Sequence, residues 1–169
     1  MQRLSLAGGR FEVALAPQTA ASTGLEQVEF LVVGHVGVEP RPLNKVASGG
    51  ELSRISLAIR VVTAQQGVMP TMIFDEVDVG IGGGVAEVVG SLLKQLGQDR
   101  QVLVITHLPQ VAAQGSHHLN VKKLQREGVT LSSIESLDSQ SRVEEIARML
   151  GGIELTETTR QHAKEMLSR

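Results

Sequence analysis

The stretch Pro70-Thr-Met-Ile-Phe-Asp-Glu76 decides the fold. A short, nearly unbroken apolar run leads directly into two acidic residues. Gln101-Val-Leu-Val-Ile105 has the same form and is followed by Thr106 and His107. Apolar runs without polar alternation are typical of strands that are buried on both faces of a parallel sheet. The sequence therefore predicts two parallel strands with polar residues at their carboxyl ends.

A helix is predicted between these two runs. Val85, Val89, Leu92 and Leu96 recur at the spacing of one helix face, and Gly97 ends the pattern. The roughly 25 residues between the runs suffice for a right-handed crossover between neighbouring parallel strands. We therefore expect a strand, a helix and a second strand in one layered unit.

Two strands and another helix are predicted before this unit. The strands are Arg10–Leu15, which stops near Pro17, and Val28–Val33, with a polar loop between them. The helix begins at Ser48 and runs to about Gln66. Its apolar face is made by four residues spaced three or four apart, which are Leu52, Ile55, Ile59 and Val62.

Two more strands and two more helices are predicted after Pro109. The strands are His118–Lys122 and Val129–Leu137, and the helices are Arg142–Leu150 and Thr156–Leu167. The expected fold is α/β, with a mostly parallel sheet flanked by helices and a β-rich N-terminal segment. At this length we expect residues 1–169 to form a single domain, with two small lobes as the alternative.

Composition excludes several classes of function. With 16 basic and 18 acidic residues, the chain has a net charge of −2, which excludes a polybasic nucleic-acid clamp. Cysteine is absent, which excludes a disulfide framework and a thiolate zinc site. Tyr and Trp are absent, so binding of single strands by base stacking is poorly supported. No transmembrane segment or secretory signal is recognised, and we expect a cytoplasmic location.

The first candidate site is Ser48-Gly49-Gly50-Glu51. One interpretation is a capping box, in which Ser48 caps the helix and Glu51 reaches back to it. Gly49 and Gly50 are poor helix formers, however, and their bare N–H groups suit an anion at the helix N-terminus. Phosphate is the natural candidate, and both interpretations remain open at this point.

The second candidate site lies at the strand ends. Asp75 and Glu76 can be acids that simply enter solvent, and His107 can be a half-buried loop histidine. Ligands of open parallel sheets, however, bind at the carboxyl ends of strands. Asp75 can hold Mg²⁺ directly or through water, and Glu76 can orient or deprotonate a water molecule. Because His107 follows the other predicted strand in the same way, we expect one shared site.

These motifs together resemble known ATPases. Their order and spacing resemble the second half of an ABC-type ATPase, with its signature loop (Ser48–Glu51), Walker B strand (Ile73–Glu76) and switch histidine (His107). Five blocks of sequence carry a narrower resemblance, and they are Val46–Arg54, Phe74–Asp78, Gly80–Gly83, Thr106–Ala112 and Ala147–Gly152. These blocks closely resemble the RecN family of bacterial DNA repair proteins, which are SMC-like and have a split ATPase head and a coiled coil.

The resemblance implies roles for the site residues. Asp75 would help to hold Mg²⁺, Glu76 would polarise the attacking water, and His107 would contact the γ-phosphate of ATP. The Ser48–Glu51 loop would bind the γ-phosphate of an ATP molecule held by a second copy of the head. Further implied partners are the N-terminal lobe of the same protein and, for the full-length protein, DNA in the bacterial nucleoid.

One motif of such ATPases is missing. The phosphate-binding pattern G-x-x-x-x-G-K-[ST] does not occur in the sequence. In the RecN family it lies in the N-terminal half, so the chain would be the C-terminal lobe of the head. Gly82 also stands where ABC transporters usually have an aspartate. Two alternatives are half of another SMC- or ABC-type ATPase and a non-catalytic α/β interaction module. An upstream phosphate-binding loop followed by two long heptad-rich segments would support the RecN-like ATPase, and the absence of that loop would favour the module.

Overall fold

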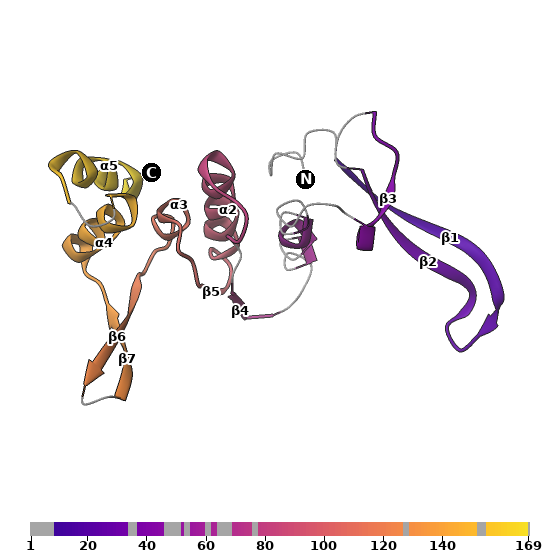
Figure 1. The fold of residues 1–169 in the computed structure, drawn as a ribbon, viewed down its shortest axis with the longest axis horizontal. Coiled ribbons are helices and arrows are strands. Elements are labelled where there is room, and N and C mark those ends of the chain that lie inside the picture. The colour runs from indigo at the N-terminus through magenta and orange to yellow at the C-terminus, as the bar shows by residue number, and fades with distance from the viewer. Residues whose placement is uncertain are drawn as a thin grey trace. The chain divides into compact units, whose positions relative to one another are not determined.

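The structure is a computed structural model that describes most of the chain. The described residues are 9–33, 37–45, 52, 55–59, 62–63, 69–75, 78–126, 129–151 and 155–168. They fall into two compact units, of which the first contains Met1–Met69 and Val77–Val88 and the second contains Pro70–Glu76 and Val89–Arg169 (Figure 1). A single domain over residues 1–169 stays a prediction.

A long antiparallel hairpin begins the first unit. Its strands are β1 (Arg10–Ala21) and β2 (Gly24–Val33), so both predicted strands are confirmed. The predicted polar loop between them is wrong, because the strands continue to a tight turn at residues 22 and 23. The register shifts between Pro17 and Ala21. Proline is tolerated in a sheet at such irregular positions, so it does not end the strand.

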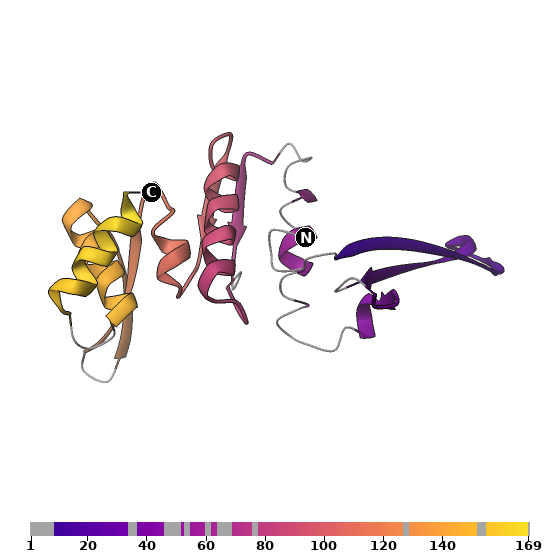
Figure 2. The ribbon, with the colours of Figure 1, turned by 90° about the horizontal axis from the view of Figure 1, so that it is seen from above.

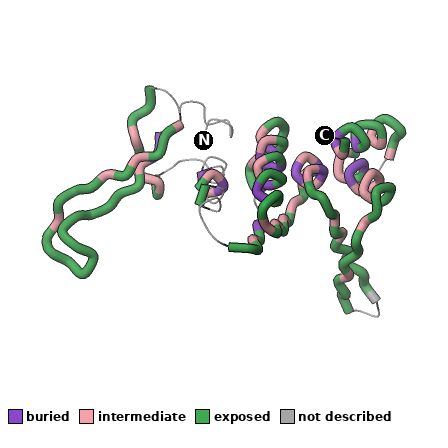
Figure 3. Tube along the Cα trace, turned by 180° about the vertical axis from the view of Figure 1, so that it is seen from behind, coloured by how far each residue is buried: buried purple, intermediate pink, exposed green. Residues whose placement is uncertain are grey.

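One face of the hairpin is apolar. Phe11 pairs with Val32 and Val13 pairs with Phe30, so their side chains share that face. The rings of Phe11 and Phe30 stack with their centroids 5.5 Å apart. Outward from this pair most of the hairpin is exposed, as Figure 3 shows in green.

The base of the hairpin carries a small core. There β2 pairs with the short strand β3 (Arg41–Pro42), which leads into the 3₁₀ turn η2 (Leu43–Lys45). Val32 and Ile55 are buried at 5% and 1% exposure, and Leu43 packs against them. This cluster joins the hairpin to the helical residues that follow.

The predicted helix from Ser48 to Gln66 is only partly covered by the structure. Its described residues, 52, 55–59 and 62–63, are helical, as predicted. The expected apolar face is only partly correct. Ile55 is buried, whereas Leu52, Ile59 and Val62 are exposed and Leu57 is buried instead. Helical spacing shows which side chains share a face, but it does not show which neighbours cover that face.

The second unit contains the predicted parallel strands. These are β4 (Thr71–Phe74) and β5 (Gln101–Val104), which are hydrogen-bonded in register along their length. The helix α2 (Gly83–Leu96) connects them along the chain, as predicted, and lies beside them in Figure 2. Among the described strands, this pair supplies the parallel pairing of the α/β fold.

Burial of both sheet faces is not observed in the described residues. Phe74 is buried at 2% exposure on one face. On the other face, Ile73 is 67% exposed, and Leu103 and Ile105 are 41% and 58% exposed. Among the described residues, the sheet is therefore buried on the face of Phe74 and exposed on the face of Ile73, Leu103 and Ile105.

The C-terminal part of the second unit is a hairpin followed by two helices. The hairpin strands β6 (Leu119–Arg126) and β7 (Val129–Ser136) are antiparallel, which confirms both predicted strands. The helices are α4 (Ser139–Gly151) and α5 (Glu157–Leu167), also as predicted. No helix in the described parts of the chain is long and apolar enough to cross a membrane.

The starts of these helices follow from their caps. The side chain of Asp138 accepts a hydrogen bond from the Ser141 N–H at 2.7 Å, so α4 begins earlier than its apolar pattern. Thr156 caps α5 in a reciprocal capping box with Thr159. The polar residues before each apolar pattern therefore set where the helix begins.

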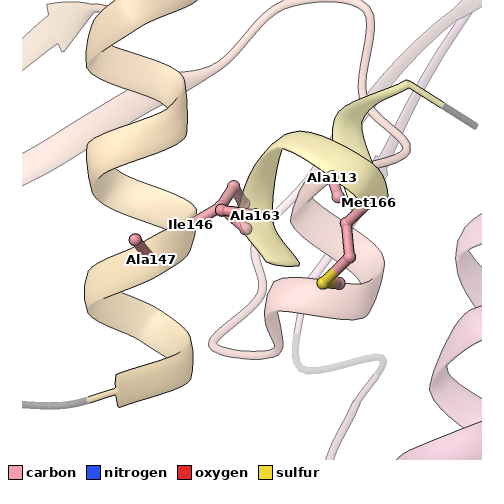
Figure 4. Close-up of a cluster of buried hydrophobic side chains, with 5 residues drawn as sticks. All are labelled: Ala113, Ile146, Ala147, Ala163 and Met166. Carbon is pink, nitrogen blue, oxygen red and sulfur yellow. The ribbon is translucent and has the colours of Figure 1, made fainter. Parts of the chain in front are cut away.

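The two helices enclose the main core of the second unit. Figure 4 shows Ile146 of α4 and Ala163 of α5 facing one another, and both are fully buried. The core cluster consists of Ala113, Ile146, Ala147, Ala163 and Met166. The helix pair is also joined by Arg160, whose Nε donates to the Glu144 carboxylate at 2.9 Å.

Candidate nucleotide site

Two predicted site residues are described, and both lie at the end of the parallel strands. Asp75 directly follows β4, and His107 follows β5 after two further residues. Ile105 N–H donates to the carbonyl of Phe74 at 2.9 Å, so the strand pairing continues up to the site. Because β4 and β5 are parallel neighbours, Asp75 and His107 follow the same edge of the sheet, and both are exposed.

The other predicted site residues lie outside the described residues. They are Ser48, Gly49, Gly50, Glu51 and Glu76. Their roles stay predictions. The structure therefore tests the strand-end placement of Asp75 and His107, and the remainder of the site depends on the sequence motifs.

The segment that carries His107 is short and held at both ends. The Thr106 Oγ1 atom accepts a hydrogen bond from the Leu108 N–H at 3.0 Å. The carbonyl of Leu108 then accepts from the N–H of Ala112 at 3.0 Å, at the start of helix α3 (Pro109–Ala112). His107 thus stands in a link of a few residues between the end of β5 and a helix.

The exposed carboxylate of Asp75 has the chemistry of a single magnesium ligand. Among the described residues, no group of three or more His, Asp or Glu side chains is placed to hold a metal. Mg²⁺ in nucleotide sites is usually held by one or two carboxylates together with phosphate oxygens and water. The exposed carboxylate of Asp75 at the strand end can supply one such ligand.

Asp78 was not singled out as a site residue in the sequence. Its side chain is 2% exposed, and its carbonyl accepts a hydrogen bond from the Ile81 N–H at 3.3 Å. Burying a carboxylate is costly unless polar partners surround it. The available signal is a third acidic residue two positions after Glu76.

The adjacent histidines of the chain have different surroundings. His117 is exposed, whereas His118 is half-buried beside α4. Burial lowers the pKa of His118 below its ordinary value, and the nearby Arg142 lowers it further, while Glu145 opposes this shift. Arg142 also donates to the backbone carbonyl of Ser116 at 3.2 Å. This cluster ties the start of the β6–β7 hairpin to α4.

The lowered pKa of His118 predicts a pH-dependent stability. The unfolded side chain titrates near pH 6.5 and the folded one below that, so the unfolded state binds more protons between the two values. The stability that neutral His118 provides is therefore complete above about pH 6.5 and is lost as the pH falls through the folded pKa.

We expect His118→Gln to reduce the fall in Tm of the chain between about pH 7.5 and about pH 5.5. Thermal unfolding followed by circular dichroism at both pH values checks this. The exposed neighbour provides a matched control, because His117→Gln should keep the parental pH dependence. A His118→Gln chain with the parental pH dependence would contradict the assignment.

Sequence comparison finds close relatives over nearly the whole chain. The DNA repair protein RecN of Xylella fastidiosa is 48% identical over 99% of the chain, and that of Vibrio cholerae is 49% identical over the same share. RecN of Bacillus subtilis is 42% identical over 90% of the chain. The chain spans about 30% of the length of the first two relatives and 27% of the third. No family model matches the chain.

Structural comparison identifies the fold. The SMC head domain with a coiled coil from Pyrococcus yayanosii matches 86% of the chain with a TM-score of 0.67 and 23% identity, and the chain covers 26% of it. A structure from work on ATP-driven dimerization and DNA-stimulated activation of SMC ATPases matches 90% of the chain. Its TM-score is 0.65 at 22% identity, and 88% of its own length is covered. The chain is therefore a relative of the RecN proteins along about 30% of their length, with the fold found in SMC ATPase heads.

Proposed function

We propose that the chain is the C-terminal lobe of an ATP-hydrolysing head in a RecN-like protein that acts in DNA double-strand-break repair and recombination. The observation that carries this proposal is the position of Asp75 and His107 beyond the carboxyl ends of the neighbouring strands β4 and β5. This is the edge at which open parallel sheets bind ligands. The similarity to RecN proteins supports the same assignment.

The proposed chemistry is phosphoryl transfer from ATP to water. Asp75 supplies one carboxylate ligand to Mg²⁺, which would neutralise charge on the phosphates. Glu76 polarises the attacking water, and His107 contacts the γ-phosphate. Catalysis then consists of positioning and electrostatic stabilisation, as is general for this reaction.

The Ser48–Glu51 loop serves a second nucleotide in this proposal. Its glycines leave backbone N–H groups bare at the predicted start of a helix, where the helix dipole favours an anion. The loop would bind the γ-phosphate of ATP that a second copy of the head holds. Two heads would thus form a homodimer with ATP enclosed between them.

The exposed face of the parallel sheet supports a further partner, the N-terminal lobe of the same protein. Ile73, Leu103 and Ile105 are between 41% and 67% exposed, although parallel sheets are normally covered on both faces. The N-terminal lobe would cover this face and provide the phosphate-binding loop. Because the net charge of the chain is only −2, most DNA contacts would lie elsewhere in the full-length protein. The full-length protein would act at the nucleoid in the cytoplasm.

This proposal predicts that the chain alone binds ATP weakly or not at all. The sequence lacks the loop that cradles the phosphates of ATP and the lysine that contacts them. Titration calorimetry with Mg²⁺–ATP should give no measurable binding to the chain at concentrations that saturate the full-length protein. The full-length protein under the same conditions is the positive control. Tight binding by the chain alone would contradict the division of the site between two lobes.

The proposed function itself is tested by ATP turnover of the full-length protein. Turnover that requires Glu76 and His107 is the expected result. A full-length protein that hydrolyses ATP equally well without either side chain would exclude the proposed site.

A further inference from the structure

Helix α3 lies unusually close to helix α2 at Gly90. A Cβ atom at Gly90 would lie 2.8 Å from the Cγ of Gln114, 3.0 Å from the carbonyl oxygen of Gln110 and 3.2 Å from the Cα of Val111. The second and third of these atoms belong to the backbone of α3 itself. Any side chain at this position would therefore push α3 away from α2, and Figures 1 and 2 show the two helices side by side.

The glycine at position 90 lowers the intrinsic stability of helix α2. Gly90 lies in the interior of a helix, where glycine is less favourable than any residue except proline. Its conformation does not require glycine, because no positive φ is found there. Gly90 is itself buried, so the close approach of α3 is the feature that calls for a residue without a side chain.

Helix α3 and His107 are separated by a single residue, Leu108, so a shift of α3 affects the backbone at His107. Pro109, the first residue of α3, follows His107 after one residue, and Val111 is 4% exposed in the contact with Gly90. On the side of β5, the backbone around His107 is held by the hydrogen bond from the Leu108 N–H to Thr106 Oγ1. A displacement of α3 cannot be absorbed by a long loop, so it would move the backbone that carries His107.

We propose that Gly90 is a positioning residue for His107, because its missing side chain seats α3 and thereby fixes the place of the imidazole relative to Asp75. This inference rests on the proposed function of His107 at the γ-phosphate. It adds a residue on the crossover helix that touches neither nucleotide nor metal. The alternative is that Gly90 serves only the packing of α2 against α3.

A double-mutant cycle in the full-length protein separates these two roles. We expect Gly90→Ala to lower kcat for ATP hydrolysis roughly tenfold, because small displacements of a catalytic group are costly. The same change in a His107→Ala background should lower the residual kcat less than twofold, since the group that Gly90 positions is already absent. The Kd for ATP should change less than twofold in both backgrounds.

Gly97 offers a matched control on the same crossover. A Cβ there would lie 3.5 Å from its nearest neighbours, which is ordinary van der Waals contact, so Gly97→Ala should keep the parental kcat. Thermal unfolding verifies that each variant is folded. If Gly90→Ala does not fold, Gly90→Ala with Gln114→Ala replaces it in the cycle, because the closest of the three contacts is then removed.

The outcomes are distinct. An unchanged kcat in Gly90→Ala, or an equal loss in both backgrounds, would overturn the positioning role and leave the proposed function intact. A parent protein without turnover, or a His107→Ala variant with full turnover, would overturn the role of His107 and this inference with it. Loss of kcat only where His107 is present supports the inference.

Discussion

A full-length protein that carries Glu76→Gln should bind ATP normally and lose its hydrolysis. Glutamine has almost the shape of glutamate but lacks the negative charge that would polarise the attacking water. Removing a general base typically lowers the rate by about 100-fold to 10,000-fold. Phosphate release at saturating ATP measures this loss, and equilibrium binding of ATP verifies that the nucleotide site is intact.

Glu29→Gln is the matched control for this prediction. Glu29 is an exposed glutamate of β2, and the same change there should leave turnover unchanged. Parental turnover in Glu76→Gln would remove Glu76 from the catalytic role. If Glu76→Gln loses both ATP binding and turnover, Glu76 instead has a structural role.

The change Ser48→Arg should abolish the association of two heads in the presence of ATP. The long side chain would occupy the space at the predicted helix start where the γ-phosphate of the facing nucleotide binds. A cation is also unfavourable at a helix N-terminus because of the helix dipole. ATP binding within one head should persist, since that site is formed by the other lobe and the strand ends.

Ser139→Arg makes the same change in the first turn of another helix. Ser139 is exposed at the start of α4, and Asp138 rather than Ser139 caps that helix. This variant should dimerise like the parent. Normal ATP-dependent dimerisation of Ser48→Arg would favour the simple capping-box interpretation of the Ser48–Glu51 loop.

The sequence predicts the parallel unit well because its signals are local. Two apolar runs, a helical spacing and a closing glycine identify β4, α2 and β5, and the pairing is as expected. The full extent of β1 is not predicted, because Pro17 indicates the end of a strand, whereas β1 continues through Pro17 and its register shifts beyond it. The exposure of Ile73 differs from the prediction, since an apolar run predicts burial on both faces but does not identify the neighbours that cover each face.

The candidate site also contains features that the sequence predicts and features that it does not. The strand-end position of Asp75 and His107 follows from the parallel pairing, which the sequence predicts. The burial of Asp78 and the contact of Gly90 with Gln114 depend on residues that meet only in three dimensions. A glycine inside a predicted helix signals a packing reason, but it does not identify the neighbour.

In the proposed function, two heads complete one ATP site. Light scattering of the full-length Glu76→Gln protein, with and without ATP, tests this arrangement most directly. The molar mass should double on addition of ATP, because bound ATP is no longer hydrolysed, and Ser48→Arg in the same protein should abolish the doubling. A mass that does not respond to ATP, or that doubles equally with Ser48→Arg, would contradict the account.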